Sequence, residues 1–108
     1  MARYSNLTLN WVTFSTDKEK AIVEMPCEIV LVPGKMLTVS YREPGLAKPT
    51  IWKGDGNVTF NLKRESPANN MPGTATMHYI SNRPRLEGFW SEGPWTGCWW
   101  VEIDEDPE

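Results

Sequence analysis

The stretch LEGFWSEGPWTGCWW, residues 86–100, decides the fold that this sequence predicts. It holds four of the chain's six tryptophans and one of its two cysteines. Two glycine–tryptophan units, Gly88-Phe89-Trp90 and Gly97-Cys98-Trp99, lie on either side of Gly93-Pro94. Because a glycine–proline pair marks a turn, we predict two short strands joined there. A hairpin of this kind is typical of a small, tightly closed β-structure rather than of a helical bundle.

The rest of the chain also favours strands over helices. Nine prolines and eight glycines interrupt it so often that no helical period persists. Short segments alternate apolar and polar residues instead, most clearly Val58, Phe60 and Leu62 with polar neighbours between them. We therefore predict one antiparallel all-β domain spanning residues 1–108, with about seven to nine short strands and a frayed acidic tail at 104–108. A small up-and-down barrel is favoured because closure removes exposed strand edges, and a β-sandwich is the alternative.

The connections between these strands can be placed as well. Pro33-Gly34 suits a type II turn, since proline fixes one dihedral angle and glycine supplies the positive one. Gly54-Asp55-Gly56 predicts a hairpin turn between a strand at 50–53 and one beginning at Asn57. A polar turn is expected at residues 16–20, and longer loops are expected at 42–49 and 66–73.

Composition limits the partners. The chain is 40% hydrophobic and 23% charged, as expected for a globular protein, and its formal net charge is −3. Without a surplus of cations to neutralise phosphates, nucleic acid is not an expected partner. No segment approaches the roughly 20 apolar residues of a membrane span, and the N-terminal residues do not resemble a signal peptide. We therefore expect no membrane association and a cytoplasmic location.

Residues for catalysis or metal binding are scarce. His78 is the single histidine, and no closely spaced cysteine pair exists, so we expect no metal site and no cofactor. Cys27 and Cys98 are far apart in the sequence, which leaves open whether they pair; a reducing compartment favours two buried free thiols. No catalytic residue is assigned, and an enzyme that uses His78 or Glu102 inside the barrel is a third alternative for the function.

The two glycine–tryptophan units resemble the glycine-x-tryptophan signature of calycin-type barrels, the lipocalin and avidin-like families. In those families the glycine lets a strand curve where the barrel closes, and the tryptophan plugs one end. The resemblance covers residues 86–103, on the last two strands, whereas those families carry the signature on the first strand. It implies an up-and-down barrel whose lumen can hold a small apolar ligand, and it carries over no individual binding residue.

The tryptophans carry the functional prediction, because six indole rings are more than so small a core conceals. We predict a non-enzymatic binding module that takes a small apolar or aromatic molecule into a tryptophan-lined lumen. Its candidate ligand-binding residues are Trp11, Trp90, Trp99, Trp100 and Tyr79. The alternative is a protein-interaction module, such as a small inhibitor or immunity-type protein or a homodimer, with Trp95, Arg83 and Arg85 at the interface. Adjacent Trp99 and Trp100 should point to opposite faces of their strand.

Overall fold

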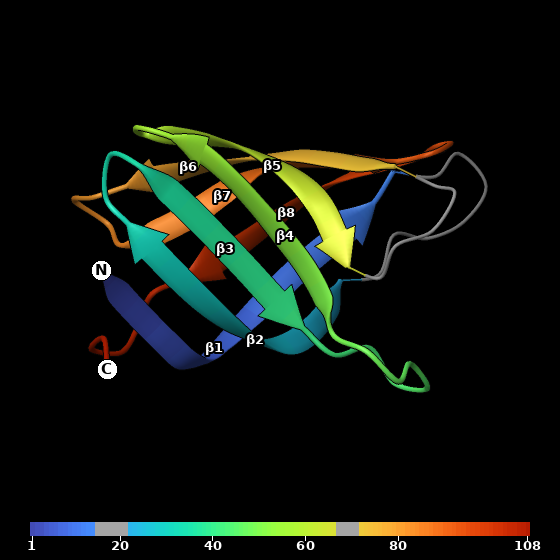
Figure 1. The fold of residues 1–108 in the computed structure, drawn as a ribbon, viewed down its shortest axis with the longest axis horizontal. Coiled ribbons are helices and arrows are strands. Elements are labelled where there is room, and N and C mark those ends of the chain that lie inside the picture. Colours follow the sequence, from blue (N-terminus) through green and yellow to red (C-terminus); the bar gives the residue numbers. More distant parts are fainter. Residues whose placement is uncertain (15–21, 67–71) are drawn as a thin grey trace.

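The computed structural model describes residues 1–14, 22–66 and 72–108. They form a closed antiparallel barrel in which each strand pairs with the next along the chain (Figure 1). Its strands are β1 (Ala2–Thr13), β2 (Val23–Val32), β3 (Met36–Tyr41), β4 (Thr50–Gly56), β5 (Thr59–Ser66), β6 (Gly73–Ile80), β7 (Arg85–Glu92) and β8 (Trp95–Glu102). The predicted all-β up-and-down barrel is confirmed, and the chain does not form the sandwich that was its alternative.

The barrel closes where the first strand pairs with the last. β1 and β8 run antiparallel, with Trp11 opposite Trp99 and Thr13 opposite Gly97. A Cβ atom on Gly97 would lie 1.9 Å from the carbonyl oxygen of Val12. A Cβ atom on Gly88 of β7 would likewise lie 1.9 Å from the carbonyl oxygen of Thr76. Both glycine–tryptophan units therefore lie where strands of the closed eight-stranded barrel approach too closely for any side chain.

One predicted turn is wrong, and the reason is the same close approach. Gly54-Asp55-Gly56 does not form the hairpin turn, because β4 continues to Gly56 and the turn falls at Asn57 and Val58. A Cβ on Gly54 would lie 1.7 Å from the carbonyl oxygen of Asn61 on β5, so this glycine permits strand contact rather than chain reversal. The turn predicted at Pro33-Gly34 joins β2 to β3, and Gly34 has φ of 71°.

The loop predicted at 42–49 joins β3 to β4. The turn predicted at 16–20 and most of the loop predicted at 66–73 fall at residues 15–21 and 67–71, outside the described residues.

The centre of the barrel is filled by inward-facing side chains from alternate strand positions. Among the described hydrophobic residues, those with no exposed surface are Leu9, Ile29, Leu37, Val39, Met77, Leu86 and Val101. Both cysteines are free thiols: Cys27 is buried in this core, whereas Cys98 is half-buried. Burial raises the pKa of the Cys27 thiol to about 12. With its middle packed in this way, the barrel leaves room for a ligand at an end or on its outer surface.

The acidic tail, residues 104–108, contains no strand and contacts β1. The backbone N–H of Glu108 donates to the carbonyl oxygen of Arg3 at 2.7 Å. The Glu105 carboxylate accepts a 3.2 Å hydrogen bond from the backbone N–H of Asn6. Within residues 1–14, 22–66 and 72–108, no helix has the length and apolar character needed to cross a membrane.

Candidate functional site

The barrel end opposite the two chain termini is where β1, β3 and β7 end and β4 and β8 begin (Figure 1). A recess lies at this end. Its volume is about 80 Å³. The residues that line it are Trp11, Tyr41, Glu43, Trp52, Trp90, Glu92 and Trp99. Six of the seven lie on strands and Glu43 lies in the loop after β3, so the barrel itself fixes most of the wall.

The aromatic rings of the recess pack in two pairs. The ring centroids of Trp11 and Tyr41 are 5.6 Å apart at an interplanar angle of 39°. Those of Trp52 and Trp99 are 5.0 Å apart at 70°, an edge-to-face arrangement. Both centroid separations lie in the range at which aromatic rings attract one another, and the edge-to-face arrangement is a preferred one, so the packing helps to hold the four rings in place.

Hydrogen bonds orient three of the four tryptophan rings that line the recess. Trp52 Nε1 donates to the hydroxyl of Tyr41 at 3.1 Å inside the barrel. Trp99 Nε1 donates to the carbonyl oxygen of Thr76 at 3.0 Å, and Trp90 Nε1 to that of Cys98 at 3.3 Å. Three indole N–H groups are thus satisfied within the protein. What these three rings present to a ligand is therefore mainly aromatic carbon.

Charged groups complete the recess. Arg64 on β5 pairs with Glu92 on β7 at 2.5 Å, and their side chains are 8% and 24% exposed. Burial raises the pKa of the Glu92 carboxyl and nearby Glu43 raises it further, while Arg64 acts in the opposite direction. Burial likewise raises the pKa of the Tyr41 phenol. No described residue forms an ion pair with half-buried Glu43, which lines the recess together with Glu92.

The predicted ligand-binding residues separate into three places. Trp11, Trp90 and Trp99 meet in the recess. Trp100 lies on the outer face of β8, where the guanidinium carbon of Arg85 is 5.7 Å from its ring centroid. Tyr79 lies near the end of β6, at the opposite end of the barrel from the recess. The recess therefore gathers three of the five tryptophan and tyrosine positions named from the sequence.

The predicted interface residues do not share one surface. Trp95 is 53% exposed at the start of β8, beside the recess end. Arg83 is exposed in the turn between β6 and β7, at the end of the barrel opposite the recess. Arg85 pairs with Glu87 at 2.9 Å and with Glu102 at 3.2 Å.

The two residues considered for an enzyme in the lumen both lie outside it. His78 is exposed and shares a 2.7 Å hydrogen bond between its Nδ1 and the hydroxyl of Thr59. The side chain of Glu102 is 63% exposed. Across the part of the chain that the structure describes, no cluster of histidine, cysteine or acidic residues is placed to hold a metal ion.

Sequence reasoning missed Tyr41, Trp52, Arg64, Glu43 and Glu92 as members of this site. A signal existed for Arg64, because it follows Phe60 and Leu62 at two-residue spacing and so continues their inward face. Glu92 follows inward-facing Trp90 in the same way. The alternation of inward and outward positions along a strand could therefore have identified Arg64 and Glu92 as charged residues that point into the barrel. Glu43 lies beyond the end of β3, so no periodicity predicts it.

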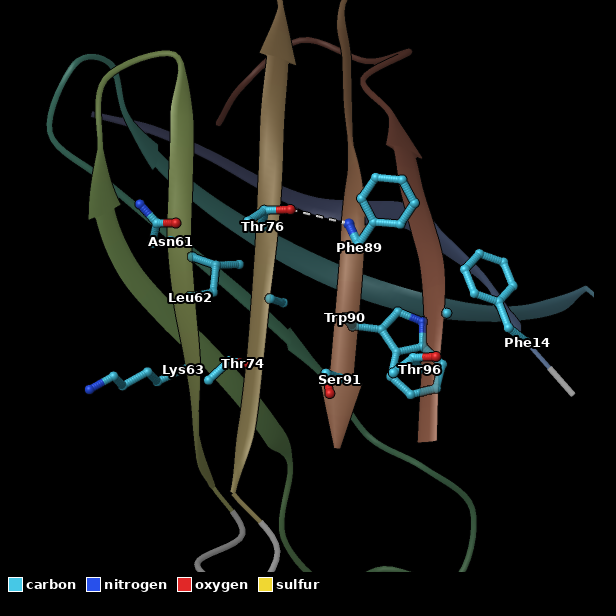
Figure 2. Close-up of a pocket in the computed structure, with 12 residues that line it drawn as sticks. Phe14, Asn61, Leu62, Lys63, Thr74, Thr76, Phe89, Trp90, Ser91 and Thr96 are labelled. Atoms are coloured by element: carbon cyan, nitrogen blue, oxygen red, sulfur yellow. Dashed lines mark hydrogen bonds between the residues drawn. The ribbon is translucent and has the colours of Figure 1, made fainter. Parts of the chain in front are cut away.

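A second candidate surface covers the outside of β5–β8 (Figure 2). Phe89 is 64% exposed there, and Phe14, just past β1, is 45% exposed. Both rings line two open hollows of about 540 and 550 Å³. Trp100 and Cys98 line the second of these, and Trp90 borders both the first hollow and the recess. This face therefore presents apolar surface that no described part of the chain covers.

No protein family, curated protein or solved structure among those compared matches this chain.

Proposed function

We propose that this protein is a non-enzymatic binding module that holds a small apolar or aromatic group in the recess at the end of its barrel. The observation that carries the proposal is the convergence of five aromatic side chains on one cavity. Binding sites for small molecules are concave and lined mainly by apolar and aromatic side chains, with few polar groups. The closed up-and-down barrel adds support, since the calycin-type barrels that it resembles can hold a small ligand in the lumen.

The size of the recess limits what it can take. A volume of about 80 Å³ is well below the roughly 300–1,000 Å³ of a pocket for a drug-sized molecule. It corresponds to a few water molecules at about 30 Å³ each. The ligand is therefore a small molecule or the head group of a larger one, with the remainder outside the barrel. Two free thiols support a reducing compartment such as the cytoplasm as the place where it acts.

The proposal can be tested by NMR on the tryptophan side chains. Each of the six tryptophans gives its own indole N–H signal in a ¹⁵N–¹H spectrum. We expect small apolar and aromatic compounds to shift the signals of Trp11 and Trp52, which line the recess and neither outer hollow. Trp95 and Trp100 lie elsewhere and serve as internal controls. Shifts confined to Trp95 or Trp100, or no shift across a broad compound set, would contradict the proposal.

A matched pair of variants makes the test independent of spectral assignment. Trp11→Leu removes one half-buried ring from the recess wall, whereas Trp100→Leu removes one half-buried ring from the outside. Binding should weaken at least severalfold in the first variant and stay within twofold in the second. Circular dichroism on both variants checks that the barrel is intact.

A protein-interaction module is the second candidate, and exposed Phe89 is the observation that favours it. Large exposed apolar patches often mark interaction sites, and here Phe14 extends the patch. The partner that can be tested directly is a second copy of this chain. Sedimentation equilibrium over a wide concentration range should then show a dimer that Phe89→Ser disrupts, with Val58→Ser, in the turn between β4 and β5, as an exposed apolar control. A strict monomer at all concentrations would exclude self-association through this face.

A further inference from the structure

The charges around the recess do not balance. Glu43 and Glu92 both line it, and Arg64 is the cation beside them. Arg64 pairs with Glu92 at 2.5 Å, and the carboxylate of Glu43 forms no ion pair with any described residue. A half-buried carboxylate beside aromatic rings is less well hydrated than one in open water, so a cation placed nearby would be attracted strongly.

The rings that make up the rest of the wall favour the same charge. The face of an aromatic ring is electron-rich, and tryptophan attracts a cation above its ring more strongly than tyrosine or phenylalanine does. Four of the five rings that line the recess belong to tryptophan. Because three of those indoles donate their N–H groups to protein acceptors, these donors are not available to an anion. The recess thus offers aromatic rings and carboxylates, with few free donors.

We infer that the recess binds a methylated ammonium group, enclosed by the rings of Trp11, Trp52 and Trp99, with the carboxylate of Glu43 as its counter-charge. This inference rests on the proposed function and specifies the chemical class of its ligand. The methyl groups of such a cation bring apolar surface to the aromatic wall, as the proposed function requires. Its diffuse charge interacts with the ring faces and with the carboxylate together.

Other charged ligands fit the recess less well. A divalent metal ion prefers several oxygen ligands around it, and aromatic carbon cannot supply them. An anion would face Glu43 directly and find Arg64 already paired. A large cation would exceed the volume of about 80 Å³, so the methylated ammonium group is the part that enters. The remainder of its molecule extends from the mouth of the barrel.

The test compares two compounds of the same shape and different charge. Choline carries a trimethylammonium group, and 3,3-dimethylbutanol replaces its nitrogen with carbon and is neutral. We expect calorimetric titration of the intact protein to show choline binding at least tenfold more tightly. The indole signals of Trp11 and Trp52 should shift with choline. Sodium chloride at equal ionic strength serves as the control for general charge screening.

Two glutamate variants locate the counter-charge. Glu43→Gln should lower choline affinity about fivefold or more and leave the affinity for 3,3-dimethylbutanol within twofold. Glu24→Gln makes the same change of net charge at an exposed position on β2 and should alter neither affinity. Equal loss of choline affinity in both variants would show a general charge effect and overturn the role of Glu43.

The outcomes separate this inference from the proposed function. Equal affinity for choline and its neutral analogue, or binding of neutral compounds alone, overturns the cationic ligand and leaves a binding recess. Absence of any compound that shifts Trp11 or Trp52 overturns both. A preference for choline that shifts only Trp100, over which Arg85 lies, places the cation outside the recess and contradicts the inference.

Discussion

The indole N–H of Trp52 donates a hydrogen bond of 3.1 Å to the hydroxyl of Tyr41, and both side chains are buried at the recess end of the barrel. This bond fixes two of the rings that line the recess in one orientation. It also removes a polar donor from the wall, because the N–H points to the phenol rather than into the cavity. The recess therefore depends on a contact between strands β3 and β4 that stabilises the fold as well.

Replacing Tyr41 with phenylalanine tests this contact. Tyr41→Phe leaves the Trp52 N–H buried without an acceptor, which should lower the free energy of unfolding by about 1–3 kcal/mol. Urea denaturation followed by circular dichroism measures the loss. Tyr79→Phe is the control, since no described residue forms a hydrogen bond with its hydroxyl. If both variants lose the same stability, the Tyr41–Trp52 bond contributes nothing beyond packing.

The glycines of the two glycine–tryptophan units should be intolerant of even one methyl group. In Gly88→Ala the new Cβ would lie 1.9 Å from the carbonyl oxygen of Thr76, so the backbone of β6 or β7 must shift. We expect a loss of at least about 2 kcal/mol, measured by thermal or urea unfolding. Thr74→Ala on the exposed face of β6 should change stability by no more than about 0.5 kcal/mol. Near-wild-type stability of Gly88→Ala would show that strand closure has more room than this geometry allows.

The pH dependence of stability should reveal the Arg64–Glu92 pair. Burial already raises the pKa of Glu92, and Arg64 is the group that lowers it, so Arg64→Met should raise it further. A carboxyl whose pKa is raised on folding stabilises the protein fully below its unfolded value of about 4.5, and that stability is lost as pH rises through the folded value. The destabilisation by Arg64→Met should therefore grow between pH 4.5 and 7.

A second substitution identifies the carboxyl responsible. In a background of Glu92→Gln there is no charge to leave unpaired, so Arg64→Met should cost a similar free energy at pH 4.5 and pH 7. Urea denaturation at several pH values on the four proteins completes the double-mutant cycle. A cost of Arg64→Met that is the same at all pH values in the wild-type background would contradict this account of the pair.

The two cysteines should differ in reactivity towards a thiol reagent at pH 8. Cys27 is 3% exposed and burial raises its pKa to about 12, so it is both enclosed and protonated in the native barrel. Cys98 is half-buried and lines an outer hollow. Ellman's reagent should therefore modify one thiol quickly, and Cys98→Ala should abolish that reaction whereas Cys27→Ala should preserve it. Fast labelling of two thiols in the native protein would show that Cys27 is accessible. Labelling of neither thiol in the native protein would contradict the exposure of Cys98 and would be expected if the two cysteines were paired.

Much of the fold was predictable because strand periodicity is a local property. The alternation at Phe60 and Leu62 and the glycine–tryptophan units near the end of the chain indicated half-buried strands and a tightly curved closure. The turn at Gly54-Asp55-Gly56 was misplaced because a glycine that permits strand contact and one that permits a turn look alike in sequence. The carbonyl oxygen of Asn61 that distinguishes them comes from the neighbouring strand.

The site was less predictable, because it forms from strand ends that are distant in sequence. Trp11 and Trp99 were named from the sequence, and the pairing of β1 with β8 brings them together. Tyr41 and Glu43 were missed, since their place in the recess depends on where β3 ends within the closed barrel. Composition supplies the number of aromatic rings, but barrel closure decides which of them meet.

The most direct measurement of the central claim is an intermolecular nuclear Overhauser experiment on the protein with bound choline. If the recess is the binding site, the methyl protons of choline lie within about 5 Å of the ring protons of Trp11 and Trp52, because the cation sits above the ring faces. Cross-peaks from the methyl protons to both rings are the predicted result. Cross-peaks to Phe89, Phe14 or Trp100 in their place would put the ligand on the outer face and contradict the account.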